Sequence, residues 1–306
     1  MTRVKTCMIL ATLAVFSCGC HTGTGVSSTT KYPLGAVPVI KDATREELLD
    51  QYNLIARGTK TLNATVELKP IAGSKYSGVI DEYHEVKAFL LAARPAQIRV
   101  IGQAPVVGTT VFDMVSDGET FRVSVPSKNK FLVGSVGVER ASNKPIENLR
   151  PQHLLDALLW PEIRKEETVI LKEFNDERAR YYVLTVLRGG YQVEVLREIW
   201  FDRADLQVAR MQTFGPKGVL LSDVQLANWQ PLDTPAGPPA AAAPTTGVTS
   251  FPRVLRIERP KDDYKLDLQV TKISLNEDIP AERFKLDQPA GAELVHVGDV
   301  TENKQP

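Results

Sequence analysis

Three cysteines lie at the front of the chain, at Cys7, Cys18 and Cys20, and the rest of the sequence contains none. Three kinds of chemistry suit such residues. A structural zinc site needs four Cys or His ligands, and only His21 lies nearby. A disulfide framework needs cysteines that are spread over the fold. The third alternative is a cysteine that serves as a covalent attachment point.

The flanks of the cysteines favour attachment. Arg3 and Lys5 precede an apolar run over residues 7–16, and the first acidic residue is Asp42. This order is typical of a secretory signal peptide, and the run is shorter than the roughly 20 residues that span a bilayer. We therefore predict a signal peptide over residues 1–20.

A small residue precedes both Cys18 and Cys20, and this pattern is similar to the bacterial lipobox, whose cysteine is lipidated. Both sites lack the leucine that is usual three positions upstream. One of these two cysteines is expected to carry the lipid anchor, and the sequence does not choose between them.

The remaining residues with catalytic potential are scattered. The four histidines are not in an H-E-x-x-H frame, and the sequence has no G-x-S-x-G elbow or phosphate-binding glycine loop. The segment 81–85, "DEYHE", gathers three carboxylates and one histidine, but side chains of a strand alternate between its faces. We expect no catalytic residue, no metal and no cofactor, and hence no enzyme.

The charge balance bears on the partners. The chain has 37 basic and 37 acidic residues, and its formal net charge is zero. Nucleic-acid binding needs a basic surface that neutralises phosphates, so we expect no nucleic-acid partner.

Two helices are predicted. Residues 21–43 are rich in Thr, Ser, Gly and Pro, which indicates a flexible tether. A helix then begins with a capping box formed by Thr44 and Glu47 and ends at Gly58. The second helix lies between Pro151 and Pro161.

The other periodic segments are strands. Residues 61–69 alternate strictly between apolar and polar side chains, and similar segments recur to give about ten to twelve strands. Residues 231–250 are rich in Ala and Pro and are interpreted as a disordered insertion. The fold class is α+β, with one large antiparallel sheet that curls and leaves a concave apolar surface.

Two long stretches, 77–136 and 197–289, resemble the LolA/LolB-like lipoprotein carriers, and most of all the DUF4292-type lipoproteins. The shared features are an Arg94-Pro95 turn, a Pro105–Gly108 turn and the "SDG" at 116–118. The resemblance implies a half-barrel domain over residues 44–299, with helices covering the concave side of the sheet. It also implies a cavity for acyl chains and an outer-membrane lipoprotein that faces the periplasm of a bacterial cell envelope.

Candidate contact residues follow from this interpretation. Val106 and Val107 lie at the tip of a turn, where they either fold back onto the sheet or touch a membrane or an acyl chain. Five more side chains line a ligand cavity or simply pack in the core, and these are Leu154, Leu155, Leu158, Trp160 and Trp200. The expected function is lipoprotein or lipid handling, with the membrane and acyl chains as partners. The alternative is a structural or assembly module that binds an envelope protein.

Overall fold

A computed structural model describes residues 40–74, 79–137, 148–175, 179–190, 192–232 and 247–297. All of these residues belong to one compact unit, Val39–Pro306. The predicted signal peptide, most of the predicted tether and residues 233–246 of the predicted insertion lie outside the described residues. Within the described residues, no helix is long and apolar enough to cross a membrane.

The two α-helices are α1 (Arg45–Gly58) and α2 (Pro151–Leu158), and the short 3-10 helices are η1 (Pro126–Lys128), η3 (Pro216–Gly218) and η4 (Ala281–Phe284). The strands of the first half are β1 (Thr61–Ser74), β2 (Val79–Glu82), β3 (Val86–Ala93), β4 (Gln97–Gln103), β5 (Thr110–Ser116), β6 (Thr120–Val125) and β7 (Lys130–Ser135). The strands of the second half are β8 (Thr168–Asn175), β9 (Arg180–Arg188), β10 (Glu194–Asp202), β11 (Val208–Phe214), β12 (Leu220–Pro231), β13 (Ser250–Arg259), β14 (Tyr264–Leu275) and β15 (Glu293–Val297).

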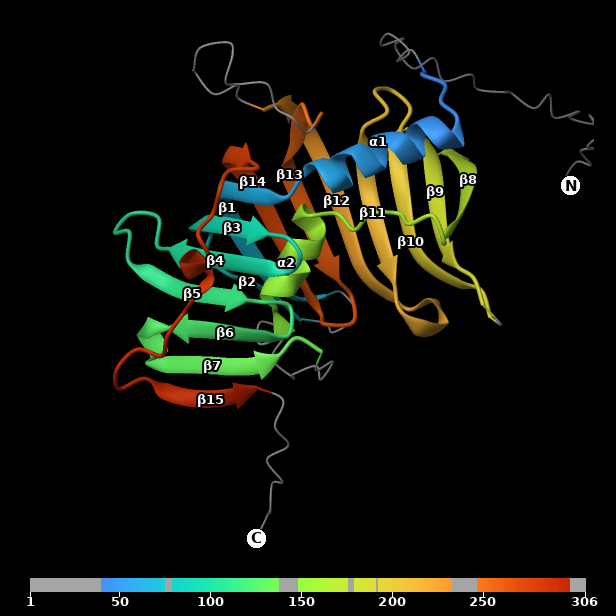
Figure 1. Cartoon of the computed structure of the whole chain (residues 1–306). Helices are drawn as coiled ribbons and strands as arrows, with labels where there is room; N and C mark the ends of the chain where they lie inside the picture. The colour runs from blue at the N-terminus through green and yellow to red at the C-terminus, as the bar shows by residue number, and fades with distance from the viewer. Residues whose placement is uncertain are drawn as a thin grey trace, which may run out of the picture. The chain divides into compact units, whose positions relative to one another are not determined.

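The strands form one large sheet, as predicted. Its order is β15-β7-β6-β5-β4-β3-β1-β14-β13-β12-β11-β10-β9-β8, and β2 adds a short pairing to β1. Every pairing in the described residues is antiparallel except that of β15 with β7. In Figure 1 the strands β4–β7 run across the view, whereas β9–β12 run down it, so the sheet turns strongly between its two ends.

β1 joins the two halves of the sheet by pairing with both β3 and β14. The predicted alternation is present, because Leu62, Ala64, Val66 and Leu68 are all buried while the intervening side chains are less so. A bulge between Thr65 and Val66 shifts the pairing with β14, and bulges of this kind increase the local twist of a strand.

Both helices begin as the sequence predicts. At α1 the hydroxyl of Thr44 accepts from the backbone N–H of Glu47, and the Glu47 carboxylate accepts from the backbone N–H of Thr44, which completes the capping box. At α2 Pro151 occupies the first turn, where its missing N–H costs no hydrogen bond. α2 ends at Leu158, three residues before Pro161.

One face of the sheet packs against the helices, and we call it the helix-side face. Its hydrophobic core includes Leu48 and Tyr52 of α1, Leu154 of α2, and buried side chains from strands in both halves of the sheet, such as Leu90 and Ile199. A single continuous core therefore joins both helices to the sheet.

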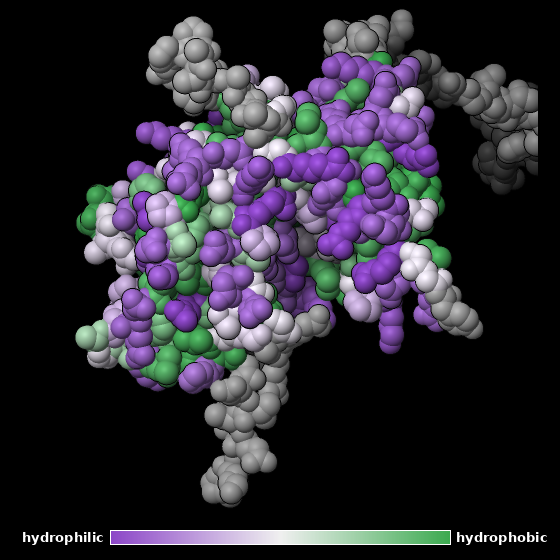
Figure 2. Space-filling model, viewed as in Figure 1, coloured by the Kyte–Doolittle hydropathy of each residue, from purple (hydrophilic) through white to green (hydrophobic). Residues whose placement is uncertain are grey.

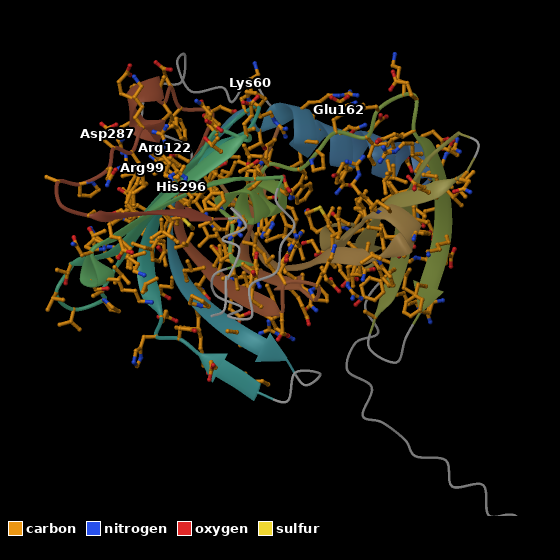
Figure 3. All side chains as sticks on the ribbon, turned by 90° about the horizontal axis from the view of Figure 1, so that it is seen from below. Lys60, Arg99, Arg122, Glu162, Asp287 and His296 are labelled. Carbon is orange, nitrogen blue, oxygen red and sulfur yellow. The ribbon has the colours of Figure 1, made fainter. Side chains whose placement is uncertain are left out.

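The C-terminal segment was not predicted to extend the sheet, yet β15 pairs with β7 in parallel. Two arginines hold the preceding residues against the sheet: Arg99 donates to the carbonyl of Arg283 at 2.9 Å, and Arg122 to that of Leu286 at 3.3 Å (Figure 3). Together with β2, β15 brings the strands of the described residues to fifteen, more than the ten to twelve predicted.

Candidate functional site

The predicted contact residues in α2 and directly after it lie in the core of the helix-side face. Leu154, Leu155, Leu158 and Trp160 are each buried to at least 97%. Trp160 stacks on Tyr52 of α1 with ring centroids 5.4 Å apart, and it meets Trp229 of β12 edge-on at 6.1 Å. These aromatic contacts join both helices to the sheet at one place.

Arg94, which follows β3, ties the ends of the two helices together. Its guanidinium donates to the carbonyl of Ala56 at 2.7 Å, to that of Thr59 at 2.9 Å and to that of Trp160 at 2.7 Å. Carbonyls at the end of a helix lack partners within the helix, so a half-buried arginine is well suited to them. The sequence pattern around Arg94 predicts only a turn.

Two side chains of α1 complete this connection. Asn53 donates to the carbonyl of Ile163 at 3.1 Å and accepts from its N–H at 2.9 Å, while the Tyr52 hydroxyl donates to the carbonyl of Pro161 at 2.8 Å. We call Tyr52, Asn53 and Arg94 the latch, because together they fix the segment that follows α2 to α1. Any movement of α2 away from the sheet must strain or break these hydrogen bonds.

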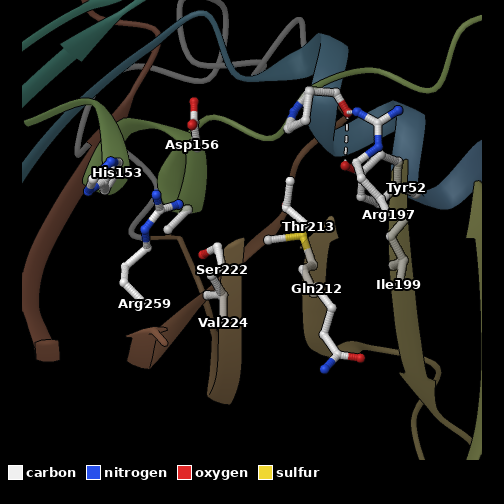
Figure 4. A pocket seen from close by; sticks show the side chains of 13 residues that line it. Tyr52, His153, Asp156, Arg197, Ile199, Gln212, Thr213, Ser222, Val224 and Arg259 are labelled. Atoms are coloured by element: carbon white, nitrogen blue, oxygen red, sulfur yellow. Dashed lines mark hydrogen bonds between the residues drawn. The ribbon is translucent and has the colours of Figure 1, made fainter. Parts of the chain in front are cut away.

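A small polar cavity lies beside the latch, between the helices and β10–β12 (Figure 4). Its volume is about 40 Å³. The polar side chains that line it include Tyr52, His153, Asp156, Arg197, Gln212 and Arg259. A water needs roughly 10–15 Å³ of such space, so the cavity has room for a few water molecules and not for an acyl chain.

The charges of the cavity are balanced by partners. Arg197 pairs with Glu167 at 2.8 Å, and Arg259 pairs with Asp262 at 2.8 Å. Burial raises the pKa of Asp156 above its ordinary value, which favours the neutral acid. In the described residues, no group of three or more His, Cys, Asp or Glu side chains is arranged to hold a metal ion.

His153 is neutral at ordinary pH. Burial, followed by the charges of Arg259 and Arg150, lowers the pKa of His153 to about 3. One ring nitrogen, Nδ1, forms a hydrogen bond with the Tyr264 hydroxyl. Burial raises the pKa of that hydroxyl. This pair acts as a buried polar link between α2 and β14.

Trp200 lies on the opposite face of the sheet from the other predicted contact residues. Its neighbours in β10, Ile199 and Phe201, belong to the helix-side core, and successive side chains of a strand point to opposite faces. On the far face Trp200 contacts Phe174 at 5.1 Å and Tyr181 at 5.7 Å between ring centroids. The structure therefore separates Trp200 from Trp160 and the α2 leucines.

Val106 and Val107 lie at the exposed tip of the β4–β5 hairpin. Their exposed fractions are 95% and 75%. The turn is closed by a hydrogen bond from the Gly108 N–H to the Ala104 carbonyl at 3.0 Å, with Gly108 at a φ of +66°. Figure 2 shows hydrophobic colour at this turn, on the left margin of the molecule. The valines do not fold back onto the sheet, which leaves them available to contact another surface.

The two remaining predicted site residues, Cys18 and Cys20, lie outside the described residues. The lipid anchor is therefore an inference from sequence, whereas the placement of the other predicted side chains follows from the fold.

Comparisons with known proteins give fold likenesses only. No family model and no curated protein matches the chain. A LolA superfamily protein from Nitrosomonas europaea has 14% identity and a TM-score of 0.47, and the match covers 80% of this chain and 99% of that one. A DUF1329 family protein from Desulfovibrio piger has 12% identity and a TM-score of 0.47, with 78% of this chain and 97% of that one covered.

A third solved structure, a domain from Vibrio parahaemolyticus described as an outer membrane lipoprotein-sorting protein, has 13% identity and a TM-score of 0.44. The match covers 77% of this chain and 94% of that one. All three TM-scores lie below 0.5, so these likenesses do not establish a family or an activity for this chain.

Proposed function

We propose that this protein is a non-catalytic, lipid-anchored protein of the bacterial outer membrane that faces the periplasm and accepts acyl chains of lipoproteins or lipids. The chains would enter between α2 and the helix-side face of the sheet. The observation that carries the proposal is the way α2 closes this face: Leu154, Leu155 and Leu158 of a helix of only eight residues cover an apolar interior.

A short helix of this kind is suited to act as a lid. An isolated helix of eight residues is unstable in water, so α2 depends on its packing. An acyl chain offers the same apolar contacts that the leucines now make with the sheet. Because the present cavity measures only about 40 Å³, α2 would have to move before a chain could enter, and the latch would set the cost of that movement.

Two features support the proposed contact with the membrane: the N-terminal sequence and the exposed tip of the β4–β5 hairpin. The positive start, the short apolar run and the small residue before Cys18 and Cys20 favour a lipid anchor. Exposed Val106 and Val107 supply an apolar contact for a membrane or for an incoming chain. Removing apolar side chains of this kind from water lowers the free energy, which favours contact with a membrane or an acyl chain.

The test uses the full chain with Cys18→Ser and Cys20→Ser. We expect these changes to move the protein from the membrane fraction to the soluble fraction, since the anchor is lost. Mass spectrometry of an organic extract of the purified soluble protein should then find an acyl-containing lipid. A double variant that stays on the membrane contradicts the anchor. A protein that carries no lipid and does not bind cis-parinaric acid contradicts the acyl-chain proposal.

A second candidate function is a structural or assembly module that binds a protein partner in the envelope. The well-filled interior favours it, because the latch and the aromatic contacts leave room only for water-sized molecules. The same experiment separates the two functions: lipid in the extract supports the carrier, and a lipid-free protein that does not bind the acyl probe supports the module.

A further inference from the structure

β8 is an edge strand, and one side of its backbone pairs with no strand of the described residues, while the Arg45 guanidinium donates to the Val169 carbonyl at 3.5 Å. β8 lies at the end of the strand order, and all eight residues, Thr168–Asn175, pair with β9 without a register shift. No other strand of the described residues pairs with it. An edge of this length presents a row of backbone N–H and C=O groups that can pair with a further strand.

Of the devices that usually protect such an edge, β8 has charged side chains but no proline and no bulge in its pairing with β9. Its sequence, "TVILKEFN", contains no proline. Its two charged side chains are half-exposed, and each is paired within the chain: Lys172 with Glu198 at 2.6 Å and Glu173 with Arg203 at 3.0 Å. Neither charge is therefore an unpaired charge that would repel an approaching strand.

Two large apolar side chains remain exposed on the same face of β8. Ile170 is 50% exposed and Phe174 is 44% exposed, and the two residues are four positions apart, which places them on one face of the strand. Phe174 is held edge-on against Trp200 at 5.1 Å, and the guanidinium of Arg210 lies over the other side of this cluster, 5.4 Å from the Trp200 ring. The apolar surface is thus supported by neighbouring strands.

We propose that β8 pairs with the β8 strand of a second copy of this chain, in the antiparallel direction, with the twofold axis at Lys172. A strand that pairs with itself must be self-complementary. In this register Ile170 lies opposite the partner's Phe174, and Phe174 lies opposite the partner's Ile170. The two exposed apolar residues therefore cover each other twice.

The centre of this register is compatible with its charges. Lys172 lies opposite the partner's Lys172, and like charges directly opposite each other are unfavourable. Each ammonium, however, is already bound to a Glu198 carboxylate within its own chain. The interface thus carries two ion pairs at its centre and an apolar contact on either side.

The first test measures the oligomeric state of the full chain with Cys18→Ser and Cys20→Ser by sedimentation equilibrium. We expect a concentration-dependent dimer, and Ile170→Lys should raise its dissociation constant at least tenfold. Val219→Lys is the matched control, since Val219 is 44% exposed, close to the 50% of Ile170, but precedes β12. Thermal unfolding of each variant shows that the fold is kept. A wild-type protein that is monomeric at every concentration, or a dimer that Ile170→Lys leaves unchanged, overturns the proposal.

The second test fixes the register. In a full chain whose three native cysteines are serine, Lys172→Cys places a single thiol on the proposed twofold axis. We expect oxidation to convert this variant to a disulfide-linked dimer, whereas Gln225→Cys, exposed on the central strand β12, should stay monomeric under the same conditions. Equal cross-linking of the two variants overturns the β8 pairing and points to random collision.

Discussion

At the scale of single residues, Arg94 makes the most consequential contacts at the site. Its guanidinium donates to three carbonyl oxygens, those of Ala56 and Thr59 at the end of α1 and that of Trp160 after α2. None of the sequence patterns around it indicates this role, because its partners are backbone atoms whose positions depend on the packed helices. Arginine before proline could be predicted only as part of a turn.

Replacing Arg94 by alanine should lower the free energy of unfolding by about 2 kcal/mol, since a half-buried charged donor is lost and three carbonyl partners lose their hydrogen bonds. The matched control is Arg57→Ala, which removes a surface ion pair to Glu162 at 2.5 Å and should lower the free energy of unfolding far less, because solvent screens exposed pairs. Urea titration of both variants checks the prediction. Equal losses at the two positions would show that the latch does not stabilise the helices.

His153 should make stability depend on pH. Burial and two nearby arginines lower the pKa of His153 from 6.5 to about 3, so between these values the unfolded chain binds a proton that the folded chain does not. The free energy of unfolding should therefore fall as the pH drops from 6.5 toward 3, by an amount on the order of 4 kcal/mol. Above pH 6.5 this contribution is fully present.

The raised pKa of Asp156 acts in the opposite sense, because its neutral form is favoured in the folded chain and its contribution is lost as the pH rises. The histidine is isolated by comparing the wild type with His153→Gln, which cannot bind the proton. The difference between their stabilities should shrink steadily from pH 6.5 to pH 3.5. A difference that is constant over this range would contradict the assignment of a buried neutral histidine.

At the scale of elements, the β4–β5 hairpin carries buried Val100 in β4 and exposed Val106 and Val107 at its tip. Changing Val106 and Val107 together to serine should alter stability by less than about 0.5 kcal/mol, since both are exposed. Val100→Ser in β4 is the control, because Val100 is fully buried and its change should cost about 3 kcal/mol.

Vesicle flotation of the Cys18→Ser, Cys20→Ser protein measures the contribution of the tip without the anchor. The tip variant should bind vesicles of anionic phospholipid more weakly than its parent does. Unchanged binding, with unchanged stability, would mean that the two valines contact something other than a membrane.

The elements also show what local patterns can and cannot predict. The capping box and the Leu48, Tyr52 spacing predict α1 because each signal lies within a few residues. β15 was missed because its pairing with β7 joins residues far apart in the sequence. The face of Trp200 was missed because β10 is apolar at both parities, so that the alternation of Ile199, Trp200 and Phe201 does not say which side meets the helices.

At the scale of the whole molecule, the sheet keeps two kinds of surface apart. The helix-side face carries the apolar core, the latch and the polar cavity, while the far face near β8 carries the Trp200 cluster and the exposed edge. An acyl chain and a second copy could therefore bind at the same time. The composition predicted a globular protein without nucleic-acid partners, but only the folded sheet assigns the candidate contacts to opposite faces.

This separation allows a direct measurement of the central claim, that acyl chains bind between α2 and the helix-side face. Two single-tryptophan proteins are made in the Cys18→Ser, Cys20→Ser chain: one keeps Trp160 and carries Trp200→Phe and Trp229→Phe, and the other keeps Trp200 and carries Trp160→Phe and Trp229→Phe. Each is titrated with a fatty acid that bears a nitroxide on its chain. We predict saturable quenching of Trp160 fluorescence and little quenching of Trp200. Quenching of Trp200 alone, or of neither tryptophan, would contradict the account.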